Sequence, residues 1–290
     1  MLDYEKTKAW RSGAVRHTYT VRDTMLYALG LGAGSDPLDA AQLRYVYEKD
    51  LVALPTMAAV LASPGAWMRE RSELGIDFLK LVHGEQGVTL HAPLPVAATV
   101  VGESRVTRII DKGEGKGAVL TVEKTLTDDA TGQLVAVCEQ VLFLRGDGGF
   151  SQGQGGDAAA PALPAVPEGA PESMLELPTR PEAALVYRLS GDTNALHVDP
   201  QVAAKAGFPR PILHGLATWG MAGRGVVQQA CGGEPHRLRA LQARLTAPVF
   251  PGETLVLESW RIGTDEVAFR VRAKERDLVV LNNGRARMDV

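Results

Sequence analysis

The chain has 290 residues, a formal net charge of −3 at pH 7, 45% hydrophobic residues and 22% charged residues. These values are typical of a globular protein with room for two domains, and the lack of a basic excess argues against a nucleic-acid partner. The sequence shows no apolar run of the roughly 18 residues that a membrane span needs. It also shows no signal-peptide core and no peroxisomal address. We therefore expect a cytoplasmic protein.

Neither the cysteines nor the histidines suggest a scaffold or a metal centre. Cys138 and Cys231 stand nearly a hundred residues apart, and Cys138 lies in the apolar run LVAVCEQVLFL, where a buried, inert thiol is expected. The six histidines are scattered without ligand spacing. We expect no metal and no disulfide.

The first half of the chain predicts two helices and then a sheet. A helix is expected from Val21 to the glycines of GLGAG, followed by an irregular stretch and an apolar helix over Thr56–Ala62. Alternating apolar and polar residues, separated by the turns DKGEGKG and DDATG, then predict four strands, at 88–92, 97–110, 118–126 and 134–144.

A segment dense in Gly, Ala and Pro, 146–178, separates the two halves. It is poor in large apolar residues, so it cannot bury enough surface to offset its ordering entropy, and we predict a linker. The predicted domains are therefore 1–145 and 179–290.

The second half repeats the plan of the first. An irregular stretch leads to an apolar helix over Leu216–Ala230, and Asn282-Asn283 marks either a turn or a bulge near the end of the chain. Four strands are predicted, at 238–245, 254–262, 267–273 and 278–287. An apolar helix wrapped by a curved antiparallel sheet is the hot-dog arrangement, so we predict an α+β double hot-dog fold.

The stretch that precedes the apolar helix of the second half carries the chemistry. Residues 187–215 read YRLSGDTNALHVDPQVAAKAGFPRPILHG, which places Asp192 and His197 five residues apart on an irregular segment. A carboxylate and an imidazole that share one water can deprotonate it and protonate a neighbouring carbon, which is what addition of water to a polarised double bond requires. On the residues alone, Asp192 could equally cap a turn and His197 could pack inside the segment.

The same stretch ends at Gly215, where the apolar helix begins. Backbone N–H groups at a helix N-terminus have no intrahelical partner and stabilise negative charge, as an oxyanion hole does. Glycine also lets a ligand approach the backbone closely. The alternative is that Gly215 only caps the helix.

This stretch resembles the signature of the MaoC-like dehydratases, and most closely the (R)-specific enoyl-CoA hydratases of type 2. The resemblance extends to YTVRDTMLYALGLGAG, LRYVYE and HGEQ in the first half and to ARLTAPVFPGETL in the second, so it covers the chain apart from the linker. One position departs from the family pattern, because Ala195 stands where a proline is usual.

The resemblance implies roles for individual residues. Asp192 and His197 become the catalytic pair, with Asp192 expected as the base in hydration and His197 as the acid, and Gly215 becomes the oxyanion donor. Asn194 either orients the shared water or serves as a turn residue. Further residues are expected to line the substrate site, namely His83, Gly84, Lys112, Thr193, Ala195, Leu196 and Leu245. Supporting roles are expected for Glu48, Tyr187 and His214, the last of which should orient the loop.

Coenzyme A, as part of the substrate, needs cationic and backbone contacts. By resemblance, His83-Gly84 lies beside its thioester arm, and Lys112 in the loop DKGEGKG meets its phosphates. That loop could also be no more than a solvated hairpin.

The resemblance implies a lyase that interconverts trans-2-enoyl-CoA and (3R)-3-hydroxyacyl-CoA as a homodimer without a cofactor. The first half lacks a GDxNxxH motif, so it should bind acyl chain and CoA without catalysing. A hot-dog acyl-CoA thioesterase and a non-catalytic acyl-CoA-binding protein are the alternatives.

Overall fold

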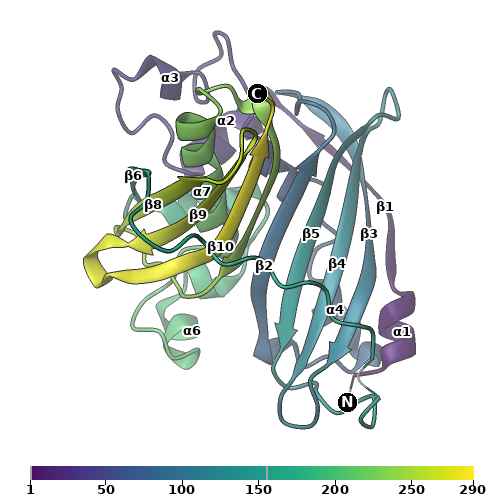
Figure 1. The fold of residues 1–290 in the computed structure, drawn as a ribbon. Helices are drawn as coiled ribbons and strands as arrows, with labels where there is room; N and C mark the ends of the chain where they lie inside the picture. Colours follow the sequence, from purple (N-terminus) through teal and green to yellow (C-terminus); the bar gives the residue numbers. More distant parts are fainter. Residues whose placement is uncertain (1, 155) are drawn as a thin grey trace.

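A single ten-stranded antiparallel sheet forms the frame of the molecule (Figure 1). The computed structural model describes residues 2–154 and 156–290. The strand order is β1-β3-β4-β5-β2-β7-β10-β9-β8-β6. The strands are β1 Arg11–Tyr19, β2 Leu81–Leu90, β3 Ala98–Asp111, β4 Ala118–Asp128, β5 Leu134–Leu144, β6 Ser173–Pro178, β7 Leu238–Leu245, β8 Thr254–Arg261, β9 Glu266–Ala273 and β10 Leu278–Met288.

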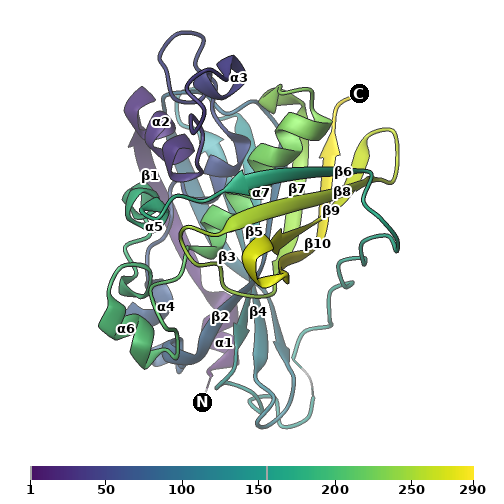
Figure 2. The same ribbon diagram turned by 90° about the vertical axis from the view of Figure 1, so that its left-hand side faces the viewer.

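One long helix, α7, packs against the sheet, and the other helices are shorter (Figure 2). The α-helices are α1 Tyr4–Ala9, α2 Val21–Gly30, α3 Ala40–Leu43, α4 Trp67–Glu70, α5 Ala183–Tyr187, α6 Pro200–Lys205 and α7 Gly215–Ala230. The 3₁₀ helices are η1 Pro55–Ala59, η2 Ser72–Leu74, η3 Phe78–Lys80, η4 Arg188–Ser190, η5 Ala195–His197, η6 Pro235–Arg237 and η7 Lys274–Arg276. No helix in the described ranges is long and apolar enough to cross a membrane.

The two halves share the sheet through the pairing of β2 with β7. Gln86 pairs with Ala243 and Val88 with Leu241, so the sheet of residues 11–144 continues without a break into that of residues 173–288. The double hot-dog architecture is confirmed, and its two sheets form one surface. The predicted helix from Val21, the predicted helix in the second half and the strands of that half are confirmed as well. Asn283 has a positive φ at a register shift in β10, so it marks a bulge.

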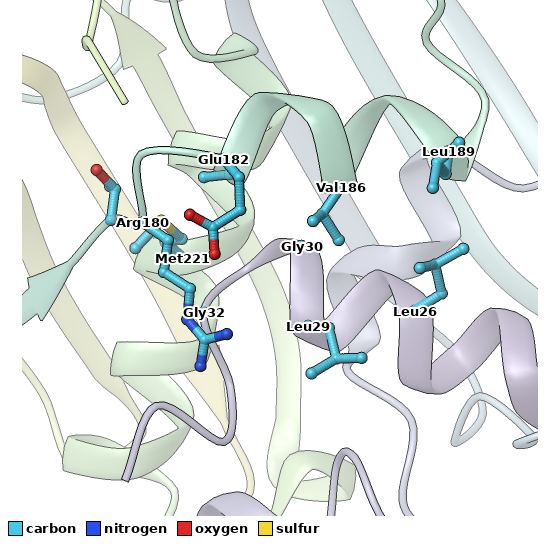
Figure 3. Close-up of a pocket in the computed structure, with 11 residues that line it drawn as sticks. Leu26, Leu29, Gly30, Gly32, Arg180, Glu182, Val186, Leu189 and Met221 are labelled. Atoms are coloured by element: carbon cyan, nitrogen blue, oxygen red, sulfur yellow. The ribbon is translucent and has the colours of Figure 1, made fainter. Parts of the chain in front are cut away.

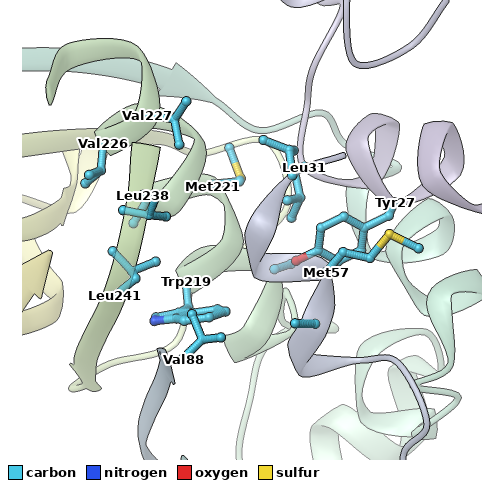
Figure 4. Close-up of a cluster of buried hydrophobic side chains, with 14 of the residues drawn as sticks. Tyr27, Leu31, Met57, Val88, Trp219, Met221, Val226, Val227, Leu238 and Leu241 are labelled. Atoms are coloured by element: carbon cyan, nitrogen blue, oxygen red, sulfur yellow. The ribbon is translucent and has the colours of Figure 1, made fainter. Parts of the chain in front are cut away.

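Helix α7 fills the core between the two halves. Residues 217–227 are all buried, including Trp219 and Met221 (Figure 4). Three glycines allow close neighbours: a Cβ at Gly220, Gly223 or Gly225 would come within 3.0 Å of a side chain from α2 or its C-cap, η1, β7 or β8. The helix is thus fixed by contacts with elements of both halves.

The apolar helix predicted over Thr56–Ala62 is wrong, because only the 3₁₀ helix η1 forms there. Pro55 starts η1, and Ala62 has a left-handed φ of 48°, which ends any helical path. The buried Lys124 donates hydrogen bonds from its ammonium to the carbonyl oxygens of Ala59 and Leu61. These carbonyls therefore have a partner that a continuing helix would otherwise have supplied.

Two edge strands were not predicted, and a third strand is longer than predicted. Strand β1 contains a register shift near Gly13, and its covered positions after the shift, 15, 17 and 19, include the polar His17, so its sequence lacks a clean apolar alternation. Strand β6 lies within the segment predicted as a linker and pairs with β8. Strand β2 begins at Leu81, seven residues before the predicted start, and so includes His83 and Gly84.

The rest of the segment predicted as a linker begins with residues held against the first half. The Asp111 carboxylate accepts hydrogen bonds from the backbone N–H groups of Gly149 and Ser151, and these bonds hold its pKa at about 2 against the opposing effect of burial. Asp157 accepts from the Tyr4 hydroxyl at 3.0 Å and pairs with Lys8. Two carboxylates therefore fix the path of a stretch whose own composition could not.

The contact between α7 and both halves predicts the effect of Gly223→Ala. The added Cβ would lie 2.5 Å from Thr56 Cγ2 and 2.9 Å from Leu241 Cδ2. We expect the free energy of unfolding in urea to fall by about 1–3 kcal/mol from overpacking, although alanine is the better helix former by about 1 kcal/mol. Gln228→Ala, on an exposed position of the same helix, should change it by less than about 0.5 kcal/mol. Equal stability of the two variants would contradict this packing.

Candidate active site

The segment between β6 and α7 forms a folded loop from short helical turns. Gly191, with a φ of 118°, ends η4 in the left-handed region that favours glycine. Asn194 then caps η5 by accepting a hydrogen bond from the Leu196 N–H, and Asp199 caps α6 in the same way, with Pro200 at its first position. These local signals give the loop its shape before any tertiary contact forms.

Two histidines tie the beginning of the loop to its end. His197 Nδ1 lies 2.9 Å from the carbonyl oxygen of Ile212, and His214 Nε2 lies 3.1 Å from the carbonyl oxygen of Asp192. Each end of the loop thus supplies one imidazole to a main-chain carbonyl of the other end. We call this pair of bonds the histidine clamp. It holds Asp192, His197 and the start of α7 in one place.

The clamp fixes the tautomer of His197. A carbonyl oxygen only accepts hydrogen bonds, so Nδ1 carries the proton and Nε2 of the neutral ring is an acceptor. The ring is buried, and burial lowers its pKa from the ordinary 6.5, opposed by the Ile212 hydrogen bond and the Asp192 charge. His197 is therefore neutral at pH 7, with Nε2 ready to accept a proton.

His214 is the more deeply buried of the two histidines, with 1% of its surface exposed. Its ring stacks on that of His197, with centroids 3.8 Å apart and planes inclined by 28°. Burial, followed by the proximity of His197, lowers its pKa to about 4. Its Nε2 donates to Asp192, and its Nδ1 is buried without a hydrogen-bond partner among the described residues. The expected role of orienting the loop stays a prediction, and the bond to the Asp192 carbonyl is the contact through which it would act.

Asp192 lies beside the stacked rings and is half-buried. Its Oδ1 accepts a hydrogen bond from the backbone N–H of Asn194 at 3.1 Å, which leaves Oδ2 for other donors. The Asn194 side chain uses its oxygen to cap Leu196, so the structure shows it in the turn role. Its amide Nδ2 donates to no described residue, and its predicted contact with water stays a prediction.

One ligand atom from each of Asp192, His197 and His214 lies within 4.8 Å of the others, close enough for a metal ion. The stacking of the two rings argues against shared coordination. Lone pairs on imidazole nitrogens lie in the ring plane, so nearly parallel rings direct them side by side and not toward a common point. The cluster is better suited to handling protons.

Gly215 begins α7 next to this cluster. His214, the N-cap residue, makes no side-chain capping bond, and no acidic residue occupies the first turn, so the positive end of the helix dipole is not neutralised locally. A Cβ at Gly215 would lie 2.2 Å from Leu245 Cδ2. Leu245 therefore packs directly against the helix start, as the sequence predicts for a residue that lines the site.

His83 joins the site from the first half. Burial lowers its pKa to about 4, and Asp192 is close enough for its charge to oppose that shift. Its Nε2 donates to the Glu85 carbonyl oxygen at 3.1 Å, and Gln140 Nε2 lies 3.5 Å from its Nδ1. Both ring nitrogens thus have protein partners. The predicted substrate contact would have to come from the ring carbons or from Gly84, where β2 shifts register against β5.

Other predicted residues lie at the edge of the site or away from it. Thr193 and Ala195 are exposed, and Leu196 is half-buried. Lys112 is exposed on the β3–β4 hairpin, three strands from β2, or about 14 Å at ordinary strand spacing. Glu48 is exposed and makes no hydrogen bond or ion pair with the residues described. No contact in the described structure therefore supports its expected supporting role.

Sequence reasoning missed an aromatic layer beneath the clamp. Tyr187 is buried, with its ring 5.0 Å from that of His214 and 5.9 Å from that of Tyr27. Tyr27 in turn donates from its hydroxyl to Thr56 Oγ1 at 3.0 Å. The layer connects the loop to α2 and η1 of the first half. The apolar surroundings raise the pKa of Tyr187 well above its usual value.

Comparison with known proteins agrees with this geometry. Residues 17–146 match the MFE-2 hydratase 2 N-terminal domain, and residues 163–283 match the MaoC like domain. The chain is 42% identical to the 3-hydroxyacyl-thioester dehydratase Y of Mycobacterium tuberculosis, over 92% of this chain and 91% of that one. It is 37% identical to the peroxisomal enoyl-CoA hydratase 2 of Arabidopsis thaliana, over 92% and 89%.

A solved structure leads to the same family. The crystal structure of a MaoC-like dehydratase from Phytophthora capsici superposes with a TM-score of 0.86 at 31% identity, covering 99% of both chains. The chain belongs to the MaoC-like hydratase 2 family. In this hydratase 2 relative the first half has no acid–base pair between α2 and η1, because residues 31–54 contain no histidine.

A cavity of about 280 Å³ in this hydratase 2 fold lies between α2 and α5 (Figure 3). Val186 and Leu189 line the cavity, whereas Tyr187 between them packs on His214. Its other walls include Leu26, Leu29, Arg180 and Met221. Neither Asp192 nor His197 borders it, so this cavity is not the reaction centre.

The buried histidines predict how the stability of this hydratase 2 relative changes with pH. The folded-state pKa values of His83 and His214, about 4, lie below the ordinary 6.5. The unfolded chain therefore binds more protons between these values, and the free energy of unfolding should fall as pH decreases from about 6.5 to about 4. We expect a loss on the order of 2 kcal/mol per histidine.

Urea unfolding at pH 7.5, 6.5, 5.5 and 4.5 measures this loss. His91→Ala, which removes an exposed imidazole, should leave the pH dependence unchanged and serves as the control. A free energy of unfolding that stays constant across this range would show that the two rings are not buried as described.

Proposed function

We propose that the protein catalyses the reversible hydration of trans-2-enoyl-CoA to (3R)-3-hydroxyacyl-CoA. The names of its relatives, an enoyl-CoA hydratase 2 and a 3-hydroxyacyl-thioester dehydratase, describe the two directions of such a reaction. The observation that carries the proposal is the site itself: His197, whose Nε2 is an acceptor, has a ring nitrogen within 4.8 Å of an Asp192 carboxylate oxygen, at the uncapped start of α7.

The water is held by two acceptors. A water molecule between Asp192 Oδ2 and His197 Nε2 donates one hydrogen to each, so a lone pair on its oxygen is directed away from both groups. If C3 of the enoyl group lies there, the oxygen attacks along that lone pair. The two groups therefore supply orientation as well as proton transfer.

The clamp favours an order of proton transfer that differs from the one expected from the sequence. Because neutral His197 presents an acceptor, it takes the proton of the attacking water, and the Asp192 carboxylate stabilises the imidazolium that forms. The C=C electrons move to the thioester oxygen as the C3–O bond forms. The imidazolium then returns its proton to C2, so one water is added and both side chains regain their starting states.

The start of α7 stabilises the negative charge of the intermediate. The enolate oxygen would accept a hydrogen bond from the Gly215 N–H at the positive end of a 16-residue helix. Leu245 packs against this point and keeps water from competing for the donor. The exposed Lys112 is proposed to meet the CoA phosphates, because the long CoA arm can reach past β2.

Three further expectations are part of the proposal. Hydration moves only a proton and a water, so the Asp–His pair needs no redox or metal cofactor, and activity should survive dialysis against a chelator. The protein is proposed to be a homodimer, which light scattering on a sizing column tests. A cytoplasmic location is proposed too, and fractionation of the source cells tests it.

Asp192→Asn and His197→Ala should each lower kcat for hydration by about 10²–10⁴. The assay follows the loss of enoyl-thioester absorbance for chains of four to sixteen carbons, with free thiol measured in parallel and product chirality determined. In the native protein, kcat/KM should be constant at neutral pH and fall below about pH 6.5, because the pKa of His197 is lowered from that value.

His236→Ala, an exposed histidine outside the site, is the matched control and should keep full activity. Release of free CoA from saturated acyl-CoA would instead indicate a thioesterase. An (S) product, or native turnover by either site variant, would overturn the proposal. Acyl-CoA binding without any turnover by the native protein would indicate a binding protein.

Gly215→Ala should lower kcat by about tenfold or more with a smaller effect on KM. The new Cβ would lie 2.2 Å from Leu245 Cδ2, so either Leu245 or the helix start must move, and small displacements of a catalytic donor are costly. In a protein that already carries Leu245→Ala, the further substitution Gly215→Ala should lower kcat much less than it does in the native protein. Strictly additive effects of the two substitutions would contradict this contact.

A further inference from the structure

His214 is a buried polar side chain with an unequal use of its two ring nitrogens. It is 1% exposed, yet one ring nitrogen donates to a main-chain carbonyl oxygen and the other has no hydrogen-bond partner among the described residues. A buried polar atom without a partner loses its hydrogen bonds to water and gains none in return. An apolar side chain would fill the same space without that cost, so space-filling does not explain an imidazole here.

We propose that His214 is a positioning residue for the hydration step: it fixes the Asp192 carboxylate and the His197 ring relative to each other. This inference rests on the proposed function, which it extends to a group that does not touch the substrate. No other described side chain contacts the catalytic pair in both of these ways, through the Asp192 backbone and through the face of the His197 ring.

The first contact sets the Asp192 carboxylate. The bond from His214 Nε2 holds the Asp192 carbonyl at 3.1 Å, and Gly191, with a φ of 118°, stands directly before Asp192. A residue that follows a left-handed glycine in an exposed turn has few local restraints. With the carbonyl held, the Asp192 carboxylate is set with respect to the start of α7, because His214 is also the N-cap of that helix.

The second contact sets the base. The ring face of His214 covers the face of His197 at a centroid distance of 3.8 Å, while the Ile212 carbonyl holds its edge. The ring of His197 is thus restrained in two directions, and its Nε2 has one orientation. Because His214 stays neutral, its ring face can lie against His197 while that ring is an imidazolium, whereas two charged rings would repel each other.

The test separates the hydrogen bond from the shape of the side chain. Glutamine places its amide nitrogen near the position of Nε2, whereas asparagine is too short to reach it, and leucine fills the space without a donor. We expect His214→Asn and His214→Leu to lower kcat for trans-2-enoyl-CoA hydration by about 100-fold with KM changed less than threefold. His214→Gln should recover to within about tenfold of the native protein.

The thermal unfolding of all three variants is measured beside the kinetics. If His214 had only a structural role, kcat would change in step with the unfolding temperature and not with the position of the donor. Equal kcat for the Gln and Asn variants, or kcat within threefold of native for His214→Leu, would overturn the inference. Should the Leu variant not fold, the comparison of Gln with Asn decides alone. His236→Ala remains the unaffected control.

Native activity distinguishes this inference from the proposed function. A native protein that hydrates enoyl-CoA and is insensitive to His214 substitution refutes only the positioning role. A native protein that hydrates no enoyl-CoA, while Asp192→Asn and His197→Ala behave like it, refutes the proposed function and this inference with it.

Discussion

The histidine clamp is the constraint on which the site depends. Two bonds, from His197 to the Ile212 carbonyl and from His214 to the Asp192 carbonyl, cross the same loop in opposite directions. Loops seldom position catalytic groups well unless their backbone is anchored. Here His197, the proposed base, is itself one of the anchors. The bond that fixes the His197 tautomer is the bond that holds the loop to the start of α7, so geometry and protonation state arise together.

The unequal halves of the molecule follow from how each fills its sheet. In the second half, the glycines of α7 let a full helix approach β7, β8 and the elements of the first half closely. In the first half, the chain between Pro55 and Ala62 makes only a 3₁₀ turn, and the buried Lys124 satisfies its carbonyls. Burial lowers the pKa of Lys124, because the interior disfavours its charged form. The hydrogen bonds to the carbonyls of the short helix offset part of that cost. A single long helix serves both halves.

Elements with a clear apolar period could be predicted from the sequence, and those defined by pairing partners could not. The strands of the second half and α7 follow alternation and helical spacing. Strand β1 is interrupted by a register shift and places the polar His17 on its covered face, and β6 lies in a segment dominated by Gly, Ala and Pro, so pairing with β3 and β8 is what defines them as strands. The run over Thr56–Ala62 is apolar because it is buried, and its sequence alone does not separate a helix from a turn.

The site divides along the same line. Asp192, His197 and Gly215 could be singled out because their spacing matches a family signature, yet the contacts that bring them together are tertiary. The carbonyl partners of the clamp carry no side-chain signal at all, and the stack of His197 on His214 joins residues 17 positions apart. His83 was predicted to lie beside the thioester arm of the substrate, and the structure gives both its ring nitrogens partners in Glu85 and Gln140. The sequence identifies reactive groups, whereas the donors and acceptors that they have left for a substrate depend on their neighbours in the fold.

Ala195 shows how the clamp relaxes a local requirement. Proline at this position would restrict φ to near −65° at the start of η5, and alanine leaves more freedom in the unfolded chain, worth about 0.4–1 kcal/mol. The fold compensates at three points around it: Asn194 caps Leu196, the Asp192 carboxylate binds the Asn194 N–H, and His197 bonds to Ile212. The turn is thus set from both sides of Ala195. His197 is held through its own ring and not through the backbone of residue 195. Alanine in place of proline therefore lowers the stability of the turn more than it changes the orientation of the His197 ring.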